Sequence, residues 1–459
     1  MNQHLSTELL QETLRGNLVR PEDSAYDDAR RVHNGMIDKR PRLIAQCADA
    51  ADVMDAVRYG REKGMDIAVR GGGHGGPGLG VRDDALVIDL GAMNGVRVDP
   101  EARTARVDAG CRWRDVDHAA HPFGLGAVSG IISSTGVGGL TLGGGHGYLS
   151  RKYGLAADNL LAADLVLADG RFVQASETQH PDLFWAIRGG GGNFGVATSF
   201  LFRLHPVGHL VGGVTFWPLD QAGEILRWYR DYISRAPEEM YGAFAFLKVP
   251  PAPQFPEALH GKNLCGVIWC HTGPEAAAED AFTHIRQAHP PLFEHIGPMP
   301  YPTLQSMFDD LYPPGQSMYW KGDFVRELSD AAIEKHLEYG GLAPNPPSTM
   351  HLYPINGAVH RVGPEETAFQ YRDATWSMVI VGVDPEGENQ QAVTDWAKDY
   401  WTALRPHSAE GGYLNFMMEE GADRIRATYG DNFDRLSRVK KRYDPENLFH
   451  VNQNIPPAA

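Results

Sequence analysis

Apolar residues in the first part of the chain recur at two spacings, one typical of helices and one of short strands. Residues 49–63 place Val53, Val57 and Tyr59 near helical spacing, and Gly64 follows them, so this segment predicts a helix. Short apolar runs predict strands at 65–70, 85–90 and 105–110. A helix among short strands predicts that the chain begins as an α/β unit.

The next apolar segments are interrupted by glycine. Residues 160–170 predict two strand-like pieces that end in a turn at Asp169–Gly170. Residues 181–206 predict a short helix, a glycine run and a long strand that ends at Pro206. Residues 71–80 predict a loop, and glycine is densest at 122–147.

Longer apolar and aromatic strands dominate the chain after residue 206. They are predicted at 210–219, 241–250, 263–273, 350–362 and 374–384. Helices are predicted between them at 220–237, where Asp220 is the expected N-cap, and at 389–404. The proline-rich segments 250–256 and 344–347 are expected to be surface loops. Few strands with long helical spacers predict a sheet that helices cover on one face, so the chain is predicted to be α+β.

Composition and charge narrow the classes of partner. The chain has 459 residues, 42% of them hydrophobic, and a formal net charge of −16. Because phosphate-rich surfaces are bound by clustered Lys and Arg, we expect no nucleic-acid or membrane partner. No CxxC pair occurs among the four cysteines, and His118 and His121 lack an evident third ligand, so we expect no disulfide framework and no metal.

The chain shows no targeting pattern. No basic stretch near the N-terminus leads into an apolar core, and no apolar run reaches the roughly 18 residues of a membrane span. We therefore expect a cytoplasmic protein.

Clustering of the 52 glycines indicates that the backbone approaches a ligand closely. A nucleoside-triphosphate loop is excluded, because no glycine is followed by Lys and then Ser or Thr. Gly190, Gly192 and Gly195 match GxGxxG, a pattern of nicotinamide dinucleotide sites. Here the pattern follows a predicted helix and precedes a predicted strand, and 210–219 lacks the acidic residue that contacts the ribose. A nicotinamide-dependent oxidoreductase is therefore only a remote alternative.

Four segments occur in an order that resembles a known family: RGGGH at 70–74, STGVGGLTLGGGHGYLSRKYGLAADNL at 134–160, RGGGGNFGV at 188–196 and YDPENLFHVNQNIPP at 443–457. The set resembles FAD-linked oxidases of the vanillyl-alcohol oxidase type, in their berberine-bridge-enzyme-like branch. The resemblance implies an FAD-binding domain of the PCMH type in two parts, 1–208 and 411–459. It implies a substrate-binding domain at 209–410, with an antiparallel sheet covered by helices.

The same resemblance implies which residues hold FAD. They are Arg70, Gly71, Gly72, Gly73, His74, Gly75, Ser134, Thr135, Gly136, Gly138, Gly139, Gly145, Gly147, Tyr148, Asn159, Gly195, Val196, Asn452 and Asn454. In the family, the histidine of RGGGH is bonded covalently to the 8α-methyl group of the flavin, which implies this bond for His74. Many relatives add a link from a cysteine, but Ile132 stands at its position. The resemblance therefore implies attachment through His74 only, and a smaller or more enclosed substrate than a large sugar.

The family's catalytic base is a tyrosine in a YxN motif, which GGYLNF matches with Tyr413 and Asn415. A tyrosine can take the proton of a substrate O–H or N–H if its phenolate is stabilised. Tyr153 matches a second tyrosine, expected to bond Tyr413 or the substrate. The family usually has an aromatic residue where His146 stands, so His146 either belongs to the site or fills that space. Some relatives carry a catalytic Glu or Gln where Ile380 is aligned, and its absence counts against oxidative ring closure.

The resemblance thus implies an FAD-dependent oxidase that moves hydride from an alcohol (a sugar, a secondary alcohol or a natural-product hydroxyl) or an amine to flavin N5. O₂ would reoxidise the flavin and yield H₂O₂. In relatives, a small residue at the position of Thr135 accompanies oxygen reactivity and Leu its loss, and Thr is nearly isosteric with Val. An FAD-dependent dehydrogenase with another electron acceptor, and a non-catalytic flavin carrier, remain alternatives. The small-molecule substrate and the oligomeric state stay open.

Overall fold

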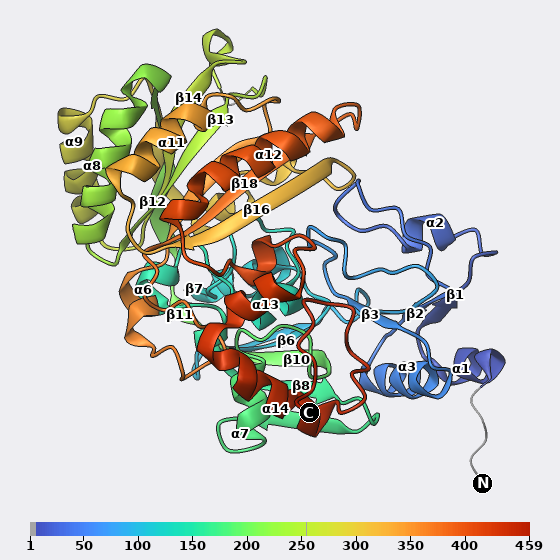
Figure 1. The fold of residues 1–459 in the computed structure, drawn as a ribbon. Helices are drawn as coiled ribbons and strands as arrows, with labels where there is room; N and C mark the ends of the chain where they lie inside the picture. The colour runs from blue at the N-terminus through green and yellow to red at the C-terminus, as the bar shows by residue number, and fades with distance from the viewer. Residues whose placement is uncertain (1–5, 254) are drawn as a thin grey trace.

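A computed structural model describes residues 6–253 and 255–459, which form three main sheets (Figure 1). A seven-stranded sheet and its helices make up one half of the molecule, and the two smaller sheets lie in the other half. The N-terminal segment and the last helices of the chain both lie with the smaller sheets.

The first sheet has the strand order β1-β2-β4-β3, formed by β1 (Asn17–Val19), β2 (Leu43–Gln46), β4 (Leu86–Asp89) and β3 (Ile67–Arg70). β4 runs parallel to β2 and to β3, which requires crossover connections. The first crossover is α3 (Ala50–Glu62), which begins where the Asp49 side chain accepts hydrogen bonds from the backbone of Ala51 and Asp52. The helix predicted at 49–63 and the strands predicted at 65–70 and 85–90 are confirmed.

The second sheet is antiparallel, with the order β5-β6-β10-β8-β9: β5 (Val96–Asp99), β6 (Thr104–Asp108), β10 (Val196–Arg203), β8 (Leu160–Val166) and β9 (Phe172–Ser176). β6, β10 and the short helix α7 (Pro181–Ala186) confirm three predicted elements. The prediction of two strand-like pieces over 160–170 is wrong. β8 is one strand because it pairs with β9 and β10 along its length, and the turn follows it.

The C-terminal helices α13 (Ala422–Tyr429) and α14 (Phe433–Tyr443) lie in the half of the molecule that holds the smaller sheets (Figure 1), and α14 packs on α7. Their buried residues share one hydrophobic core with residues from Leu10 onward. Lys440 is fully buried, and its Nζ lies 2.6 Å from the Asp444 carboxylate. The same ammonium donates to the carbonyls of Asn193 and Phe449, at 2.7 and 2.9 Å, so it ties the last segment of the chain to the glycine run after α7.

The third sheet is antiparallel and has the order β15-β12-β14-β13-β17-β18-β16: β15 (Phe293–Pro300), β12 (His209–Pro218), β14 (Asn263–His271), β13 (Met240–Lys248), β17 (Thr349–Pro354), β18 (Trp376–Asp384) and β16 (Ser317–Val325). Five of these strands match predictions, and β15 and β16 were not predicted. The strand predicted over 350–362 is too long. It ends at Pro354, which cannot donate to a sheet, and a 3₁₀ turn at Gly357–Arg361 follows.

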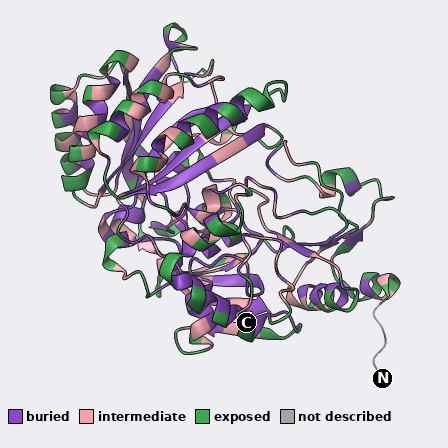
Figure 2. Cartoon of the chain, in the orientation of Figure 1, coloured by how far each residue is buried: buried purple, intermediate pink, exposed green. Residues whose placement is uncertain are grey.

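Four helices cover one face of this sheet (Figure 1): α8 (Ala222–Arg235), α9 (Glu275–Ala288), α11 (Asp330–Gly340) and α12 (Gln390–Leu404). The opposite face is buried as well, in a separate cluster that includes Val214, Phe216 and Val379. Figure 2 shows the strands buried and the outer sides of the helices exposed. Burial on both faces explains why these strands read as continuous apolar runs. Asp220 is not an N-cap, because it lies in a 3₁₀ turn before α8, whose N-cap position is Gln221.

Shorter elements connect the sheets: α1 (Thr7–Thr13), α2 (Tyr26–Ala29), α4 (Trp113–Ala120), α5 (Val137–Leu142), α6 (Ser150–Tyr153), α10 (Tyr301–Ser306), β7 (Leu125–Gly126) and β11 (His205–Pro206). Among the described residues, no helix combines the length and the apolar character that crossing a bilayer requires. The arrangement is α+β, as predicted, while the domain boundaries at 208 and 410 stay a prediction.

Candidate active site

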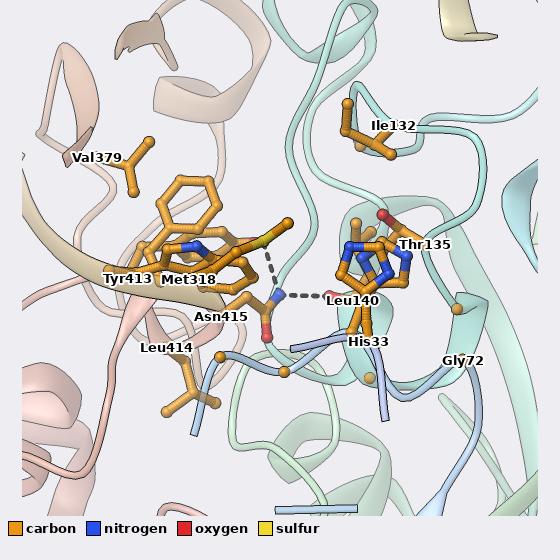
Figure 3. Close-up of a pocket in the computed structure, with 18 of the residues that line it drawn as sticks. His33, Gly72, Ile132, Thr135, Leu140, Met318, Val379, Tyr413, Leu414 and Asn415 are labelled. Carbon is orange, nitrogen blue, oxygen red and sulfur yellow. Dashed lines mark hydrogen bonds between the residues drawn. The ribbon is translucent and has the colours of Figure 1, made fainter. Parts of the chain in front are cut away.

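A cavity of about 450 Å³ lies between the seven-stranded sheet and the rest of the chain (Figure 3). Chain segments 69–80, 130–142, 191–197, 413–417 and 449–453 contribute to its wall, together with strands of the large sheet. The fold therefore gathers the glycine-rich segments, the YxN motif and Asn452 of the C-terminal segment around one space.

Two glycine loops meet backbone to backbone on one side of this cavity. A Cβ atom on Gly72 would lie 2.5 Å from the backbone of Gly136, and one on Gly136 would lie 2.4 Å from the backbone of Gly72. Gly73 has a φ of +68°, which residues with a side chain rarely adopt. The wall here is therefore bare backbone, whose N–H groups can face an anionic ligand.

His74 follows the first glycine loop and lies against a second histidine, His33, which the sequence did not indicate. The two rings are stacked with centroids 3.8 Å apart, and Nε2 of His74 lies 3.0 Å from Oγ of Ser134. Burial lowers the pKa of His74 well below its ordinary value, and positive charge on His33 or Arg112 would lower it further. Burial also lowers the pKa of His33 to about 4. Both imidazoles are therefore neutral at pH 7, the form in which one ring nitrogen keeps a lone pair.

The loop that carries Thr135 is held from two sides. The backbone N–H of Trp113, at the start of α4, donates to the carbonyl of Thr135 at 3.0 Å. The carboxylate of Asp309 accepts a hydrogen bond from the backbone N–H of Ser133 at 3.0 Å, and another from the Ser133 hydroxyl. Ile132 and Thr135 both line the cavity (Figure 3). The fixed loop thus presents one apolar and one small side chain to the cavity.

The phenol oxygen of Tyr413 accepts two hydrogen bonds inside the cavity wall. One comes from the backbone N–H of Gly145 at 3.0 Å and the other from Nδ2 of Asn415 at 2.8 Å. Nδ2 of Asn415 also donates to the carbonyl of Leu140 at 3.1 Å, which fixes the amide (Figure 3). Burial raises the pKa of Tyr413 to about 12, and the two donors oppose that rise. Because both donors stabilise the phenolate, the arrangement suits a tyrosine that gives and takes a proton.

His146 lies beside Tyr413, with ring centroids 4.5 Å apart, and contributes to the cavity wall. Its ring also approaches those of Tyr353, at 5.4 Å, and Phe416, at 5.5 Å. Burial lowers the pKa of His146 to about 3, so the ring is neutral. Both of its nitrogens are buried and find no hydrogen-bond partner within the described chain. Of the two interpretations the sequence allowed, this placement favours membership of the site.

The large sheet turns alternate residues of each strand toward the cavity. On β18, Val379 and Val381 line it, whereas Ile380 is fully buried on the face that the helices cover. Ile380, which the sequence aligns with a catalytic carboxylate position, therefore does not face the cavity, because the register of β18 in the sheet turns its two neighbours inward. Both inward residues are valines, so this part of the strand offers no carboxylate.

Side-chain amides of the C-terminal segment close another part of the wall. Asn452 and Gln453 line the cavity, and Nδ2 of Asn452 donates to the carbonyls of Gly192 and Phe449 at 3.3 and 3.0 Å. The Oδ1 atoms of Asn452 and Asn454 are buried and unpartnered among the described residues. A bound molecule with N–H or O–H donors would satisfy an oxygen of this kind.

The predicted site residues fall into three groups. Those lining the cavity are Arg70, Gly71, Gly72, Gly73, His74, Gly75, Thr135, Gly136, Gly138, Gly139, Gly195, Tyr413 and Asn452. Ser134 and Gly145 lie behind the lining, where Ser134 is at hydrogen-bond distance from His74 and Gly145 donates to Tyr413. The others lie outside the lining: Gly147, Tyr148, Tyr153, Asn159, Val196 and Asn454.

Tyr153 and Asn159 belong to a separate cluster around His205, which places Tyr153 away from the cavity lining. The Tyr153 ring is stacked on His205 with centroids 3.9 Å apart, and His205 Nε2 lies 2.6 Å from Oδ1 of Asn159. The amide of Asn159 donates to the backbone carbonyls of Tyr153 and Leu155. Tyr148 is also structural, because its ring packs edge-on against Tyr241 at 5.6 Å.

The residues present fit a flavin dinucleotide on several independent counts. Bare glycine backbone suits a pyrophosphate, a neutral histidine stands at the end of the first loop, and an unpartnered asparagine oxygen suits a polar ring or ribityl chain. The GxGxxG pattern at Gly190–Gly195 lies between helix α7 and strand β10, the reverse of the strand-to-helix order of a nicotinamide site.

Two family models match the chain. The model described as an FAD binding domain matches residues 41–176, and the model described as berberine and berberine like matches residues 412–456. The first match contains both glycine loops and His74. The second contains Tyr413 and Asn415.

Relatives are similar to this chain over nearly all of its length. It is 32% identical over 421 residues to an FAD-linked oxidoreductase of Dictyostelium discoideum, covering 91% of this chain and 89% of that protein. It is 30% identical over 475 residues to (R)-6-hydroxynicotine oxidase of Paenarthrobacter nicotinovorans, covering 100% and 99%. The crystal structure of 6-hydroxy-D-nicotine oxidase from Arthrobacter nicotinovorans matches with a TM-score of 0.87 and 28% identity, covering 97% of this chain and 99% of that one.

Proposed function

The chain belongs to the berberine-bridge-enzyme-like family of FAD-linked oxidoreductases, and from that premise we propose that it is an oxidase of small alcohols or amines. FAD, when bound, takes a hydride equivalent from the substrate and passes the electrons to O₂, which becomes H₂O₂. The observation that carries the proposal is the Tyr413–Asn415 pair, held at hydrogen-bond distance in the wall of a cavity that bare glycine backbone also lines.

In this proposal, the cofactor is held by two parts of the chain, 1–208 and 411–459, and the substrate by 209–410. His74 forms the covalent bond to the cofactor, which its burial as a neutral imidazole supports. Ile132 cannot form a second covalent bond, so the attachment is single. The glycine backbone of 71–75 and 136–139 would hold the pyrophosphate, and Asn452 would hold the polar part of the cofactor.

Tyr413 acts as the base that takes the O–H or N–H proton of the substrate. The hydrogen bonds from Gly145 and Asn415 stabilise its phenolate, and they act in a buried setting where such bonds are strong. Thr135 presents a small side chain to the cavity, which supports oxygen as the electron acceptor. The alternative is a dehydrogenase that passes electrons to another acceptor.

Acid precipitation of the purified protein, followed by visible spectra of pellet and supernatant, tests the cofactor. Flavin that stays in the pellet is expected from the His74 bond. Flavin in the supernatant would refute that bond alone, and flavin in neither fraction would refute the proposed cofactor.

A peroxide assay with a panel of alcohols, amines and sugars tests the reaction. We expect H₂O₂ in step with substrate consumption. Substrate oxidation that consumes an artificial acceptor but forms no H₂O₂ would identify a dehydrogenase. The Tyr413→Phe protein is the matched control, because it keeps the ring and loses the proton-accepting oxygen. Undiminished turnover by this variant would assign the base elsewhere.

A further inference from the structure

We infer that the substrate is an uncharged, largely apolar ring compound with a second hydroxyl or carbonyl group, which His146 and His351 bind while Tyr413 acts on the reacting group. The inference rests on the proposed oxidase function and names the substrate class of the same site. Three features of the cavity lead to it: the apolar wall formed by the sheet, the absence of carboxylates, and a row of neutral polar rings.

Apolar side chains dominate the wall that the large sheet presents. They are Val214 and Phe216 on β12, Leu247 on β13, Ile268 on β14, and Val379 and Val381 on β18. None of these side chains can form a hydrogen bond with a hydroxyl group. A sugar carries a hydroxyl on most of its carbons, and burying them without partners is unfavourable. The wall therefore favours an apolar ring over a saccharide.

Charge in the cavity argues against a cationic substrate. None of the described residues that line it is an Asp or a Glu. Its positive side chains are Arg70, whose guanidinium is paired with Asp89 at 2.7 Å, and Lys248 at the end of β13. An ammonium group would meet no opposite charge here and would lose its hydration, so an uncharged substrate fits best.

Three polar-tipped rings continue from Tyr413 along the wall. His146 lies 4.5 Å from Tyr413, Tyr353 lies 5.4 Å from His146, and His351 lies 5.2 Å from Tyr353, measured between centroids. Both nitrogens of His146 and Nδ1 of His351 are buried and have no hydrogen-bond partner in the described part of the chain. Burial lowers the pKa of His146 to about 3 and that of His351 to about 4, so each offers one donor and one acceptor.

The side chains around both histidines form part of the wall that the substrate would contact. The ring neighbours of His146 are Tyr413, Tyr353 and Phe416. His351 is paired in the sheet with Ala245 on β13 and Val379 on β18, and all three line the cavity. A buried imidazole among apolar neighbours is unfavourable unless a ligand supplies its partner, which an oxygen substituent on the substrate would do.

Calorimetric titration of the flavin-loaded protein under argon tests this inference. Three of the four probes have no alcohol or amine C–H to lose as hydride, and argon prevents continued turnover of the fourth, a sugar. The probes are 4-hydroxyacetophenone, its methyl analogue 4-methylacetophenone, and the cation 4-acetyl-N,N,N-trimethylanilinium, with xylotriose as the sugar. We expect 4-hydroxyacetophenone to bind about 2- to 12-fold more tightly than the methyl analogue, the value of one hydrogen bond. The cation and xylotriose are expected to bind more weakly than either.

In His146→Phe or in His351→Leu, 4-hydroxyacetophenone should bind about as tightly as the methyl analogue. The affinity for the methyl analogue itself should equal that of the parent protein. His146→Asn serves as a second variant if the phenylalanine does not fold. His284→Phe, at an exposed position on α9, is the matched control and should keep the full advantage.

Tighter binding of xylotriose or of the cation would overturn the substrate class, as would failure of either ketone to bind. An unchanged probe ranking in both histidine variants would overturn the assignment of these residues. A His146→Phe protein whose flavin spectrum changes before any probe is added, with the ranking intact, would assign His146 to the cofactor instead. The visible spectrum and the peroxide assay report separately on the proposed oxidase. H₂O₂ formed from a sugar would therefore refute the substrate class inferred here and leave the oxidase function intact.

Discussion

Replacing Asn415 with Leu removes one of the two hydrogen bonds that hold the Tyr413 phenol oxygen. The side chains are similar in size, so the change deletes the Nδ2 donor, 2.8 Å from that oxygen, with little change in volume. The N–H of Gly145 stays as the second donor, at 3.0 Å. The variant therefore probes how much one neutral donor contributes to the basicity of a buried tyrosine.

The size of the effect follows from the charge on the phenolate. A hydrogen bond to a charged group contributes about 1.5–3 kcal/mol, and one pKa unit corresponds to about 1.4 kcal/mol. The pKa of Tyr413, about 12 with both donors in place, should therefore rise by about 1–2 units. Below that pKa, the phenolate fraction falls tenfold per unit, so proton removal should slow by about 10- to 100-fold at constant pH.

The assay is anaerobic stopped-flow reduction of the flavin by an alcohol from the substrate panel, followed across the neutral and alkaline range. The rate constant of flavin reduction should rise with pH as the phenolate forms. In Asn415→Leu we expect this rise at higher pH, with the flavin spectrum unchanged. The double variant with Tyr413→Phe completes a cycle. Asn415→Leu should cost nothing further once the phenol oxygen is gone. An equal loss in both backgrounds would refute the reasoning, because Asn415 would then act independently of Tyr413.

Three further predictions concern attachment and stability. His74→Ala should release its flavin into the supernatant on acid precipitation, and a pellet that stays yellow would assign the bond to another residue. Lys440→Met should lower the free energy of unfolding by about 3–5 kcal/mol, because it leaves the carboxylate of Asp444 buried without its cation, whereas exposed Lys441→Met should have little effect in the same thermal melt. Burial lowers the pKa of His146 from about 6.5 in the unfolded chain to about 3 in the fold. Between these two pH values, only the unfolded chain takes up a proton at this residue. The free energy of unfolding should therefore fall by about 1.4 kcal/mol for each pH unit below about 6.5, until the pH reaches about 3. Melting temperatures should therefore drop less steeply with acid in His146→Phe than in the parent.

Local patterns in the sequence determined the parts of the site that are made of backbone. Gly72 and Gly136 are needed because the two loops meet there without room for a Cβ atom, and the glycine clusters around them predict the loops directly. The YxN spacing likewise puts Asn415 within reach of Tyr413, because two residues of one 3₁₀ turn lie close whatever the rest of the chain does. Long apolar runs predicted five strands of the large sheet for the same local reason.

Side-chain direction depended on partners that are distant in the sequence. Ile380 and Val379 are both apolar, and only the pairing of β18 with β16 and β17 decides which of them faces the cavity. Tyr153 sits in a motif that predicts a site residue, yet its ring stacks on His205, which a separate strand brings to it.

The motifs of the sequence thus predicted a flavoprotein fold through their resemblance to a known family, and spacing within single segments predicted the glycine loops and the Tyr413–Asn415 pair. Tertiary structure decided which other groups share the cavity: His33 against His74, and His146 in a row with Tyr353 and His351. These residues come from segments that no local pattern connects. Their meeting depends on how the large sheet packs against the glycine loops. Burial in one shared cavity keeps the histidines neutral, and it leaves both nitrogens of His146 and Nδ1 of His351 without partners among the described residues.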